Sequence, residues 1–212
     1  MPSFHQISPH FPALVIDAAS SDVQVGLLES TRAAQARWQT SSDEAGVAVF
    51  EAVKNLGVEM ADVRAFIFCE GPGSVLGIRT VAMALRTWLV LQPRPVFAYC
   101  SLALVAHAIG RDEVSVIVDA RRESWHHYKI GQGLRRVPAA ALGGELVMPE
   151  HFRHWAALPA NVKTVPYSVA ELLPKIWDAE LLRETDAPDA FLHEEPGYVT
   201  WTPQIHRAPG TR

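Results

Sequence analysis

Two aspartates have the sequence setting that best suits chemistry. Asp17 and Asp119 each end a short apolar run that is typical of a buried strand, and each precedes a short polar turn. The pentapeptides Leu-Val-Ile-Asp-Ala at 14–18 and Val-Ile-Val-Asp-Ala at 116–120 match about half a chain apart. This repeat predicts a duplicated lobe whose two carboxylates face one cleft. There they could hold Mg²⁺ or act as acid and base; alternatively, each carboxylate could bond only its own turn.

The histidines do not form a pattern that predicts a metal site. His126 and His127 are neighbours in a predicted strand, so their rings point to opposite faces of the sheet. His151 and His154 have i,i+3 spacing in a helix predicted over 147–158 and could share a metal, but no clear third ligand accompanies them. A solvated helix face is therefore the favoured interpretation, and we predict no metal site.

A glycine- and proline-rich joint separates a short apolar run from a long helical pattern over 75–91. Ser74 is placed to cap that helix, and Gly77 lies on its packing face. Such a joint could bind phosphate at the helix N-terminus or could serve only as a tight turn. Neither GxxxxGK(S/T) nor GxGxxG is present, and Ser74 suits a cap better than a nucleophile, so we predict no catalytic residue here. The turn motif comprises Gly71, Pro72, Gly73, Ser74 and Gly77.

Elements of the first half alternate between strands and helices, which predicts α/β architecture with parallel strands. Ser41 and Glu44 have capping-box spacing before a helix that runs to Leu56 and ends at Gly57. Ser101 is expected to cap a helix that Gly110 closes. The predicted strands are 13–17, 22–29, 30–40, 65–69 and 96–99, and the predicted helices are 42–56, 75–91 and 101–109.

The second half of the chain repeats the strand pattern of the first, and after that the sequence signals for helices and strands become weaker. Ser168 is expected to cap a helix through Arg183, in which Pro174 must lie near the first turn or cause a kink. The expected strands are 114–119, 124–130, 134–137 and 161–165, besides the helix at 147–158. We divide the chain into a loose lead-in at 1–12, an N-terminal lobe at 13–110, a C-terminal lobe at 111–200 and an irregular tail at 201–212.

The two long helices of the first half have apolar residues outside their core-facing stripes. Val47 and Phe50 lie off the stripe of the first helix, and the outer arc of the second mixes apolar groups with arginines. Methionine and arginine are enriched where proteins meet, so this arc suits a partner face or a cover by the same chain. The residues of this predicted face are Val47, Phe50, Leu76, Arg79, Thr80, Met83, Arg86, Thr87 and Val90.

The composition argues against some classes of protein, such as membrane-spanning proteins. A net charge of −4 argues against a chain that binds nucleic acid without the help of another protein. No run of about 18 apolar residues is present, so we predict no membrane span. We find no signal-peptide pattern in the first dozen residues. Cys69 and Cys100 lack CxxC spacing and are expected to be free thiols in the cytoplasm.

The segment Cys-Glu-Gly-Pro-Gly-Ser-Val-Leu-Gly-Ile-Arg at 69–79 resembles the G-P-G-S-F-T-G-(L/I/V)-R signature of the TsaB (YeaZ) proteins. Leu-Val-Ile-Asp-Ala-Ala at 14–19 resembles the opening I-D-T-S strand of that family. Ser-Leu-Ala-Leu-Val-Ala at 101–106 resembles its S-S-L-x-A-L-A helix, and Val-Asp-Ala-Arg-Arg-Glu at 118–123 resembles its D-A-R-R-x-E-V-Y turn. The sequence Pro-Gly-Tyr-Val at 196–199 resembles the closing P-x-Y-L-R.

This resemblance implies an α/β, actin-like (ASKHA, ribonuclease H-like) fold of two duplicated lobes with mixed sheets and flanking helices. It implies a non-catalytic scaffold and activator that pairs with a TsaD-like transferase through helices 42–56 and 75–91. The complex makes N6-threonylcarbamoyladenosine at position 37 of tRNA, and a TsaE-like ATPase joins it. ATP and threonylcarbamoyl-AMP would be used by the complex, with neither bound by this chain alone. Contact with tRNA would come only through the complex, and the isolated chain is expected to form a homodimer.

Several residues depart from the family signature. Val75-Leu76 replaces Phe-Thr, Ala18-Ala19 replaces Thr-Ser, and the histidine often found at the start of the first helix is absent. These departures make Asp17 and Asp119 vestigial cleft carboxylates. The alternative functions are an active ASKHA-type phosphotransferase or hydrolase that uses both aspartates, and a metallopeptidase-like relative.

Overall fold

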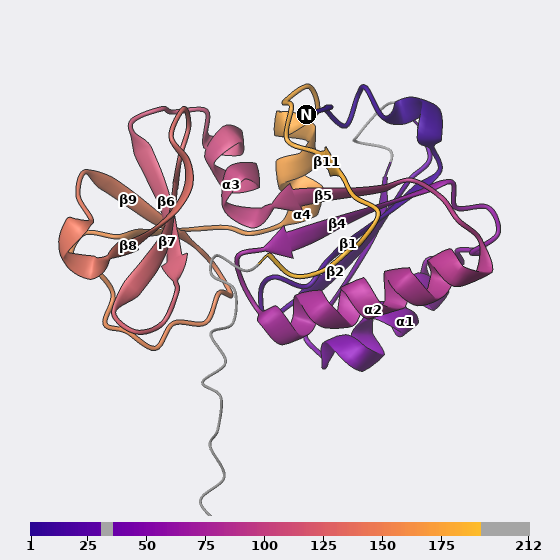
Figure 1. Cartoon of the computed structure of the whole chain (residues 1–212), viewed down its shortest axis with the longest axis horizontal. Helices are drawn as coiled ribbons and strands as arrows, with labels where there is room; N and C mark the ends of the chain where they lie inside the picture. The colour runs from indigo at the N-terminus through magenta and orange to yellow at the C-terminus, as the bar shows by residue number, and fades with distance from the viewer. Residues whose placement is uncertain (31–35, 192–212) are drawn as a thin grey trace, which may run out of the picture.

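A computed structural model describes residues 1–30 and 36–191 of the chain. It contains two mixed β-sheets joined through α3 (Figure 1). The first sheet has six strands in the order β11-β5-β4-β1-β2-β3. Its strands are β1 (Ala13–Asp17), β2 (Val23–Leu28), β3 (Arg37–Ser41), β4 (Ala65–Gly71), β5 (Val96–Cys100) and β11 (Arg183–Glu184).

The second sheet has five strands in the order β10-β9-β6-β7-β8. An antiparallel meander of β6, β7 and β8 is extended on the other side of β6 by parallel β9 and β10. The first sheet has the same plan, with β1, β2 and β3 as the meander and β4 and β5 as the parallel strands. The predicted duplication is therefore confirmed. The bounds are β6 (Val114–Asp119), β7 (Ser124–Lys129), β8 (Gly133–Pro138), β9 (Glu145–Pro149) and β10 (Lys163–Val165).

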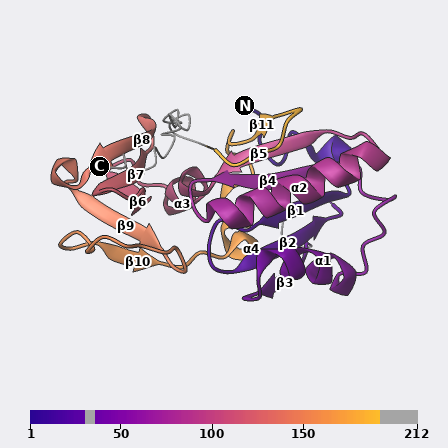
Figure 2. The same ribbon diagram turned by 60° about the horizontal axis from the view of Figure 1, so that its bottom comes forward.

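Helices cover both faces of the first sheet (Figure 2). The helices α1 (Ala45–Asn55) and α2 (Val75–Leu91) pack on one face, and α3 (Ser101–Ile109) packs on the other with α4 (Val169–Leu172). None of the described helices is long and apolar enough to cross a membrane. Three short 3₁₀ helices, η1 (Ser8–His10), η3 (Ala139–Ala141) and η4 (Leu173–Ile176), complete the described elements.

Strand β1 lies at the centre of the first sheet and is buried on both sides, as its continuous apolar run predicts. Leu14 and Ile16 face the cluster under α1 and α2. Ala13 and Val15 face the cluster under α3 and η4, and by the alternation of strand side chains Asp17 lies on that second side. The sequence thus places a carboxylate at the end of a strand from which water is excluded.

The joint between β4 and α2 is held tightly against the turn that follows β1. Ser74 caps α2 by accepting a hydrogen bond from the Gly77 backbone N–H at 3.3 Å, as predicted. The Ser74 backbone N–H donates to the Ala19 carbonyl at 2.7 Å. A Cβ atom at Gly73 would lie 2.2 Å from the Ala19 carbonyl oxygen, and one at Gly77 would lie 2.4 Å from that of Ala18. These glycines are therefore required for the close approach of two backbones.

Two predicted helix caps in the first half of the chain are wrong. Helix α1 begins at Ala45 after Glu44, which makes no side-chain cap, because Ser41 still belongs to β3 and its hydroxyl bonds Asp43. The Ser101 hydroxyl donates to the Pro72 carbonyl at 2.6 Å instead of capping α3. Ser41 is thus held by its strand and by a local bond to Asp43, and Ser101 is held by a tertiary contact.

The second half contains less helix than its sequence predicts. No helix forms over 147–158, because β9 extends to Pro149 and His151 has a φ of 66°, outside the helical region. The helix predicted over 168–183 ends as α4 and η4 at Ile176, and Ser168 makes no side-chain cap. Pro174 lies at the start of η4, where its missing N–H breaks the α-helical pattern.

The first dozen residues are packed, contrary to the expected loose lead-in. Phe4 is fully buried, and its ring stacks on Trp177 with centroids 6.0 Å apart. Ile7 and Phe11 are also buried in the same cluster. The expectations for 31–35, for the tail at 201–212 and for the segment 196–199 lie outside the described residues. The lobe boundaries remain predictions, although β11 joins the first sheet rather than the second.

Substitution of Gly77 tests the close approach of α2 to the turn after β1. We expect Gly77→Ala to lower the free energy of unfolding by about 1–3 kcal/mol, because the added Cβ atom overlaps a backbone oxygen that cannot move away cheaply. Urea denaturation measures this change. In the control Gly46→Ala, a Cβ atom meets nothing within 4 Å, so helix propensity should stabilise the chain by up to about 1 kcal/mol. Equal effects of the two substitutions would contradict this account.

Candidate functional site

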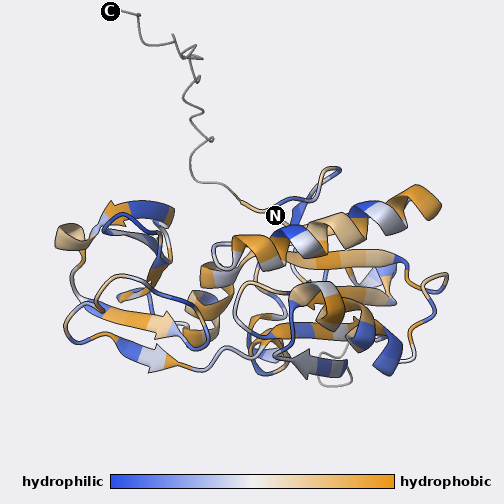
Figure 3. Ribbon diagram, turned by 90° about the horizontal axis from the view of Figure 1, so that it is seen from below, coloured by the Kyte–Doolittle hydropathy of each residue, from blue (hydrophilic) through white to orange (hydrophobic). Residues whose placement is uncertain are grey.

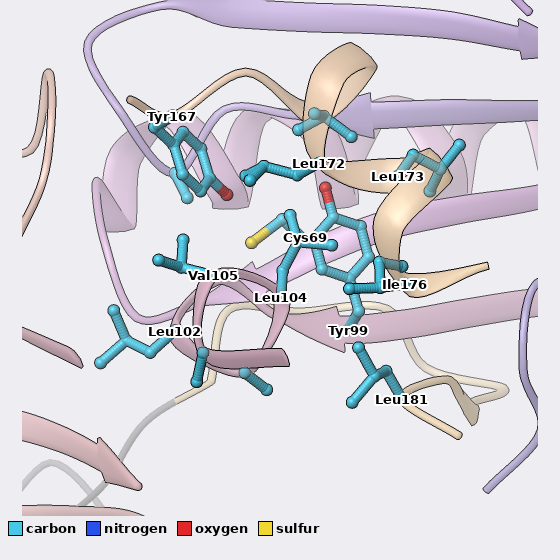
Figure 4. Packing of buried hydrophobic residues seen from close by; sticks show 14 of the residues in the cluster. Cys69, Tyr99, Leu102, Leu104, Val105, Tyr167, Leu172, Leu173, Ile176 and Leu181 are labelled. Atoms are coloured by element: carbon cyan, nitrogen blue, oxygen red, sulfur yellow. The ribbon is translucent and has the colours of Figure 1, made fainter. Parts of the chain in front are cut away.

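The carboxyl group of Asp17 is sealed in the core of the first lobe. Its side chain is fully buried, with one oxygen accepting hydrogen bonds from the Tyr99 hydroxyl at 2.6 Å and the Tyr167 hydroxyl at 2.7 Å. The other oxygen accepts from the Ala19 backbone N–H at 2.9 Å. Figure 4 shows the two tyrosines with Cys69 between them. Asp17 therefore has its hydrogen-bonding capacity filled from within the chain.

Burial dominates the electrostatics of this cluster. It raises the pKa of Asp17 above its ordinary value, although the hydrogen bonds from Tyr167, Tyr99, Ala19 and Cys69 act to lower it. Burial and the nearby Asp17 charge also raise the pKa of both tyrosines well above their usual range, so their hydroxyls stay protonated as donors. No group in the cluster is exposed to a substrate.

The second aspartate has a different setting. Asp119 accepts three backbone hydrogen bonds, from the N–H groups of Arg121 at 2.5 Å, Trp155 at 2.6 Å and Ala156 at 2.8 Å. Partial burial acts to raise the pKa of Asp119, but the three donors outweigh it and hold the pKa below the ordinary value. This carboxylate therefore ties the loop after β9 to the turn between β6 and β7.

A shallow hollow of about 420 Å³ lies beside Asp119. The Arg121 guanidinium stacks over the Trp155 ring, with its central carbon 4.2 Å from the ring centroid. Arg121, Arg122 and Glu123 adopt left-handed φ values of 61°, 50° and 57°, which turns the chain sharply between the strands. The hollow is lined by Asp119, Arg121, Arg122, Glu123, Trp155 and Ala156.

The predicted cleft between the two carboxylates is wrong. Asp17 is fully buried and does not line the hollow beside Asp119. Each carboxylate instead bonds the N–H two residues ahead in its own turn, which was the alternative interpretation. The sequence signalled neither Tyr167 nor Trp155, which act on these carboxylates from 150 and 36 residues away.

The histidines and cysteines do not assemble a metal site. Within residues 1–30 and 36–191, no three His, Cys, Asp or Glu residues are grouped to hold an ion. The His154 ring pairs with the Ala156 carbonyl at 3.1 Å, and His151 lies 3.7 Å from the Asp22 carboxylate, so the two rings have separate partners. Cys69 and Cys100 are free thiols, as expected.

The outer sides of α1 and α2 expose large apolar side chains. Leu76 is 80% exposed, Val90 is 85% exposed and Met83 is 57% exposed. Val47 and Phe50 are exposed on α1, which packs beside α2. In Figure 3 the long helix α2 shows orange turns interrupted by paler and blue ones. We call Val47, Phe50, Leu76, Met83 and Val90 the apolar face; the further exposed residues Val75 and Leu91 extend it.

The arginines predicted to join this face have a partner within the chain. The Asp189 carboxylate lies 3.1 Å from the Arg86 guanidinium and 3.9 Å from that of Arg79. The hydroxyls of Thr80 and Thr87 bond the helix backbone at 2.9 Å, through the Leu76 and Met83 carbonyls. The predicted arc therefore divides into an apolar part that is open and a charged part that the segment near Asp189 contacts. Its role as a partner face stays a prediction.

Comparison with known proteins identifies the family. Residues 38–150, more than half of the chain, match the TsaD family, described as tRNA N6-adenosine threonylcarbamoyltransferase. The chain belongs to this family. Within it, the chain is a divergent TsaB-like member. No curated protein matches the sequence.

Two solved structures share the fold. YeaZ from Pseudomonas aeruginosa aligns with a TM-score of 0.52 and 23% sequence identity over 65% of this chain and 74% of that protein. An uncharacterized protein with similarity to peptidase YeaZ from Pseudomonas aeruginosa aligns with a TM-score of 0.54 and 20% identity over 76% of this chain and 88% of that protein. The duplicated, actin-like α/β architecture is thereby shown.

Removal of the Tyr167 hydroxyl tests how much its hydrogen bond to the buried Asp17 carboxyl stabilises the fold. We expect Tyr167→Phe to lower the free energy of unfolding at pH 7 by about 1–3 kcal/mol, because a buried acceptor loses a donor. Because the pKa of Asp17 is raised in the folded state, the neutral carboxyl stabilises the fold fully at pH values below the ordinary pKa of 3.8. This stabilisation is lost as the pH rises through the pKa of Asp17 in the folded state. The variant raises that pKa further, so its loss of stability should shrink as pH falls toward 3.8.

Urea denaturation at pH 7 and at about pH 4.5 measures both parts of this expectation. The control Tyr128→Phe removes a half-buried hydroxyl that pairs with the His107 ring at 3.3 Å, so its effect should be smaller. A Tyr167→Phe loss that is the same at both pH values would show that the Asp17 charge does not contribute.

Removal of the Asp119 carboxylate tests the tether between the two loops. In Asp119→Ala the N–H groups of Trp155 and Ala156 lose their acceptor, so their amide exchange should speed up by about tenfold or more. Hydrogen exchange with peptide-level readout over 150–158 measures the change. Glu123→Ala is the control, because Glu123 lines the same hollow without bonding this loop. Unchanged protection in Asp119→Ala would contradict the tether.

Proposed function

We propose that this chain is a non-catalytic scaffold partner of a TsaD-like transferase in the modification of tRNA to N6-threonylcarbamoyladenosine at position 37. Membership of the TsaD family supports a role in this pathway. The observation that carries the scaffold role is the apolar face on α1 and α2. The partner is a paralogue of the same fold, which can present a matching helical surface.

The apolar face has the chemistry of a protein interface. Five large apolar side chains from two packed helices gather there, and a monomeric chain rarely leaves such a group open to water. Arg79 and Arg86 lie at its side and supply the charged rim that surrounds many interfaces. A helix that only covered its own sheet would place polar groups in these positions.

The structure favours neither of the enzymatic alternatives. A phosphotransferase or hydrolase that used Asp17 and Asp119 would need both carboxylates beside one substrate, but Asp17 is sealed by two tyrosine hydroxyls. A metallopeptidase would need a group of metal ligands, and the described part of the chain holds none. The scaffold role needs neither arrangement.

The rest of the proposed assembly follows from the scaffold role. A TsaE-like ATPase joins the pair, and the complex rather than this chain alone uses ATP and threonylcarbamoyl-AMP. Contact with tRNA is made through the complex. Without its partner, the chain covers the apolar face with a second copy and forms a homodimer.

A charge in the centre of the apolar face tests the proposal. We expect Met83→Asp to weaken binding to the TsaD-like chain of the same genome at least about tenfold, because a carboxylate would be desolvated in the interface. Co-purification followed by titration calorimetry measures the loss. Met83 is more than half exposed in the isolated chain, so the substitution should leave its stability unchanged.

Leu158→Asp is the matched control, since Leu158 is an exposed apolar residue on the loop between β9 and β10 of the second lobe. It should bind like the unmodified chain. Normal binding by a folded Met83→Asp variant, or no binding by the unmodified chain, would refute the proposed face.

A further inference from the structure

A second hollow, of about 260 Å³, lies on the second sheet and is lined by positive side chains. His127 of β7 pairs with Arg135 of β8 in the antiparallel register, and Lys129 is two residues further along β7. Side chains at these positions point to the same face of the sheet. Gln132 from the β7–β8 turn and Ser115 of β6 add polar groups to the lining. Three basic residues therefore surround one small space.

The positive charge of this hollow has no counterpart within the described residues. None of its lining residues is acidic, and neither Lys129 nor Arg135 forms an ion pair with a described carboxylate. On β9, by contrast, the Glu145 carboxylate lies 2.8 Å from the Arg111 guanidinium and 3.2 Å from the Lys163 ammonium. Two cations held close together without an anion repel each other, so this arrangement suits a negatively charged ligand.

The pKa of His127 is also affected by the positive charge of this hollow. Burial lowers the pKa of its ring, and the charges of Lys129 and Arg135 lower it further. Its Nδ1 atom is shielded from water and has no hydrogen-bond partner in the part of the chain that the structure describes. His127 therefore lines the hollow beside two cations, and its Nδ1 atom, being buried, is not among the groups that a ligand in the hollow could reach.

We propose that this hollow binds a phosphate group of a nucleotide or of RNA. An arginine binds two phosphate oxygens through its planar fork, and a lysine adds a point charge, which is the combination that Arg135 and Lys129 offer. The Gln132 amide supplies a further neutral donor. The space is below the roughly 300–1,000 Å³ of pockets for drug-sized ligands, so it suits one phosphate with its sugar rather than a whole cofactor.

The site is local and does not make the chain a strong binder of nucleic acid. The net charge of the chain is −4, so repulsion from the rest of the surface limits its affinity for a polyanion. Two full cations correspond to about two phosphate contacts. If RNA is the ligand, the logarithm of its affinity should fall with the logarithm of salt concentration with a slope of about −1.4 to −1.8.

This inference goes beyond the proposed function and does not depend on it: binding of a nucleotide or RNA by this chain alone would add to the contacts that the proposed function leaves to the complex, and pairing through α1 and α2 would stand. The hollow lies on β7 and β8, whereas the apolar face lies on α1 and α2 at the other end of the molecule (Figure 1). Loss of phosphate binding would leave pairing through α1 and α2 untouched, and the reverse also holds. The two proposals can therefore fail separately.

The test uses the full chain and two probes that separate the sources of phosphate. Titration calorimetry with AMP and with inorganic pyrophosphate probes a nucleotide site, and fluorescence anisotropy with a labelled RNA hairpin probes the RNA backbone. Whichever probe the unmodified chain binds, the variant Lys129→Gln/Arg135→Gln should bind it at least about tenfold more weakly. The control Lys54→Gln/Lys175→Gln removes the same charge from exposed positions on α1 and η4, outside the hollow, and should bind as the unmodified chain does.

The outcomes distinguish the possibilities. Binding of AMP that only the β7–β8 variant loses assigns the hollow to a nucleotide, and the same result with RNA and the expected salt slope assigns it to a backbone phosphate. Binding of pyrophosphate alone would show a site for free phosphate and overturn both sources. Equal losses in both variants would show unspecific charge attraction and overturn the proposal. So would a failure of the unmodified chain to bind any of the probes. Thermal melting of both variants confirms that they remain folded.

Discussion

The contact between the start of α2 and the turn after β1 is the constraint on which the rest of the first lobe depends. The Ser74 N–H bonds the Ala19 carbonyl at 2.7 Å, and glycines at 73 and 77 let the two backbones come together without a side chain between them. This contact fixes the direction in which α2 leaves the sheet, and thereby which of its residues face water. It also holds the turn that positions Asp17. One close approach of backbones thus orients the helix that carries the apolar face and holds the turn that follows Asp17.

The two halves of the chain share a strand plan but give equivalent residues different surroundings. In the first half, Asp17 is enclosed by Tyr99 from β5 and by Tyr167, which arrives from beyond the second sheet. In the second half, Asp119 lies near the surface and accepts backbone N–H groups from a loop. Burial raises the pKa of the first carboxyl, whereas three donors lower that of the second. Duplication therefore preserved the strand ends and not the cleft chemistry that two facing aspartates could perform.

The features available to other molecules lie at opposite ends of the fold. Helices α1 and α2 cover the first sheet and expose the apolar face, while the second sheet has no counterparts of these two helices among the described residues and opens a basic hollow on β7 and β8. The segment that returns to the first sheet at β11 also places Asp189 against the arginines of α2, so the charged side of the face is already neutralised by the chain itself.

The sequence by itself determined the parts of this protein that depend on neighbours along the chain. The apolar runs of β1 and β6, the span of α2, the Ser74 cap and the duplication were all predictable, because periodicity and turn chemistry act over a few residues. Only the tertiary structure decided the rest. Ser101 bonds Pro72 rather than its own helix, residues 147–158 form a strand end and a loop rather than a helix, and Phe4 is buried rather than loose. Asp17 turned inward rather than toward a cleft because tyrosines 82 and 150 residues away supply its hydrogen bonds, and contacts across such separations leave no local pattern in the sequence.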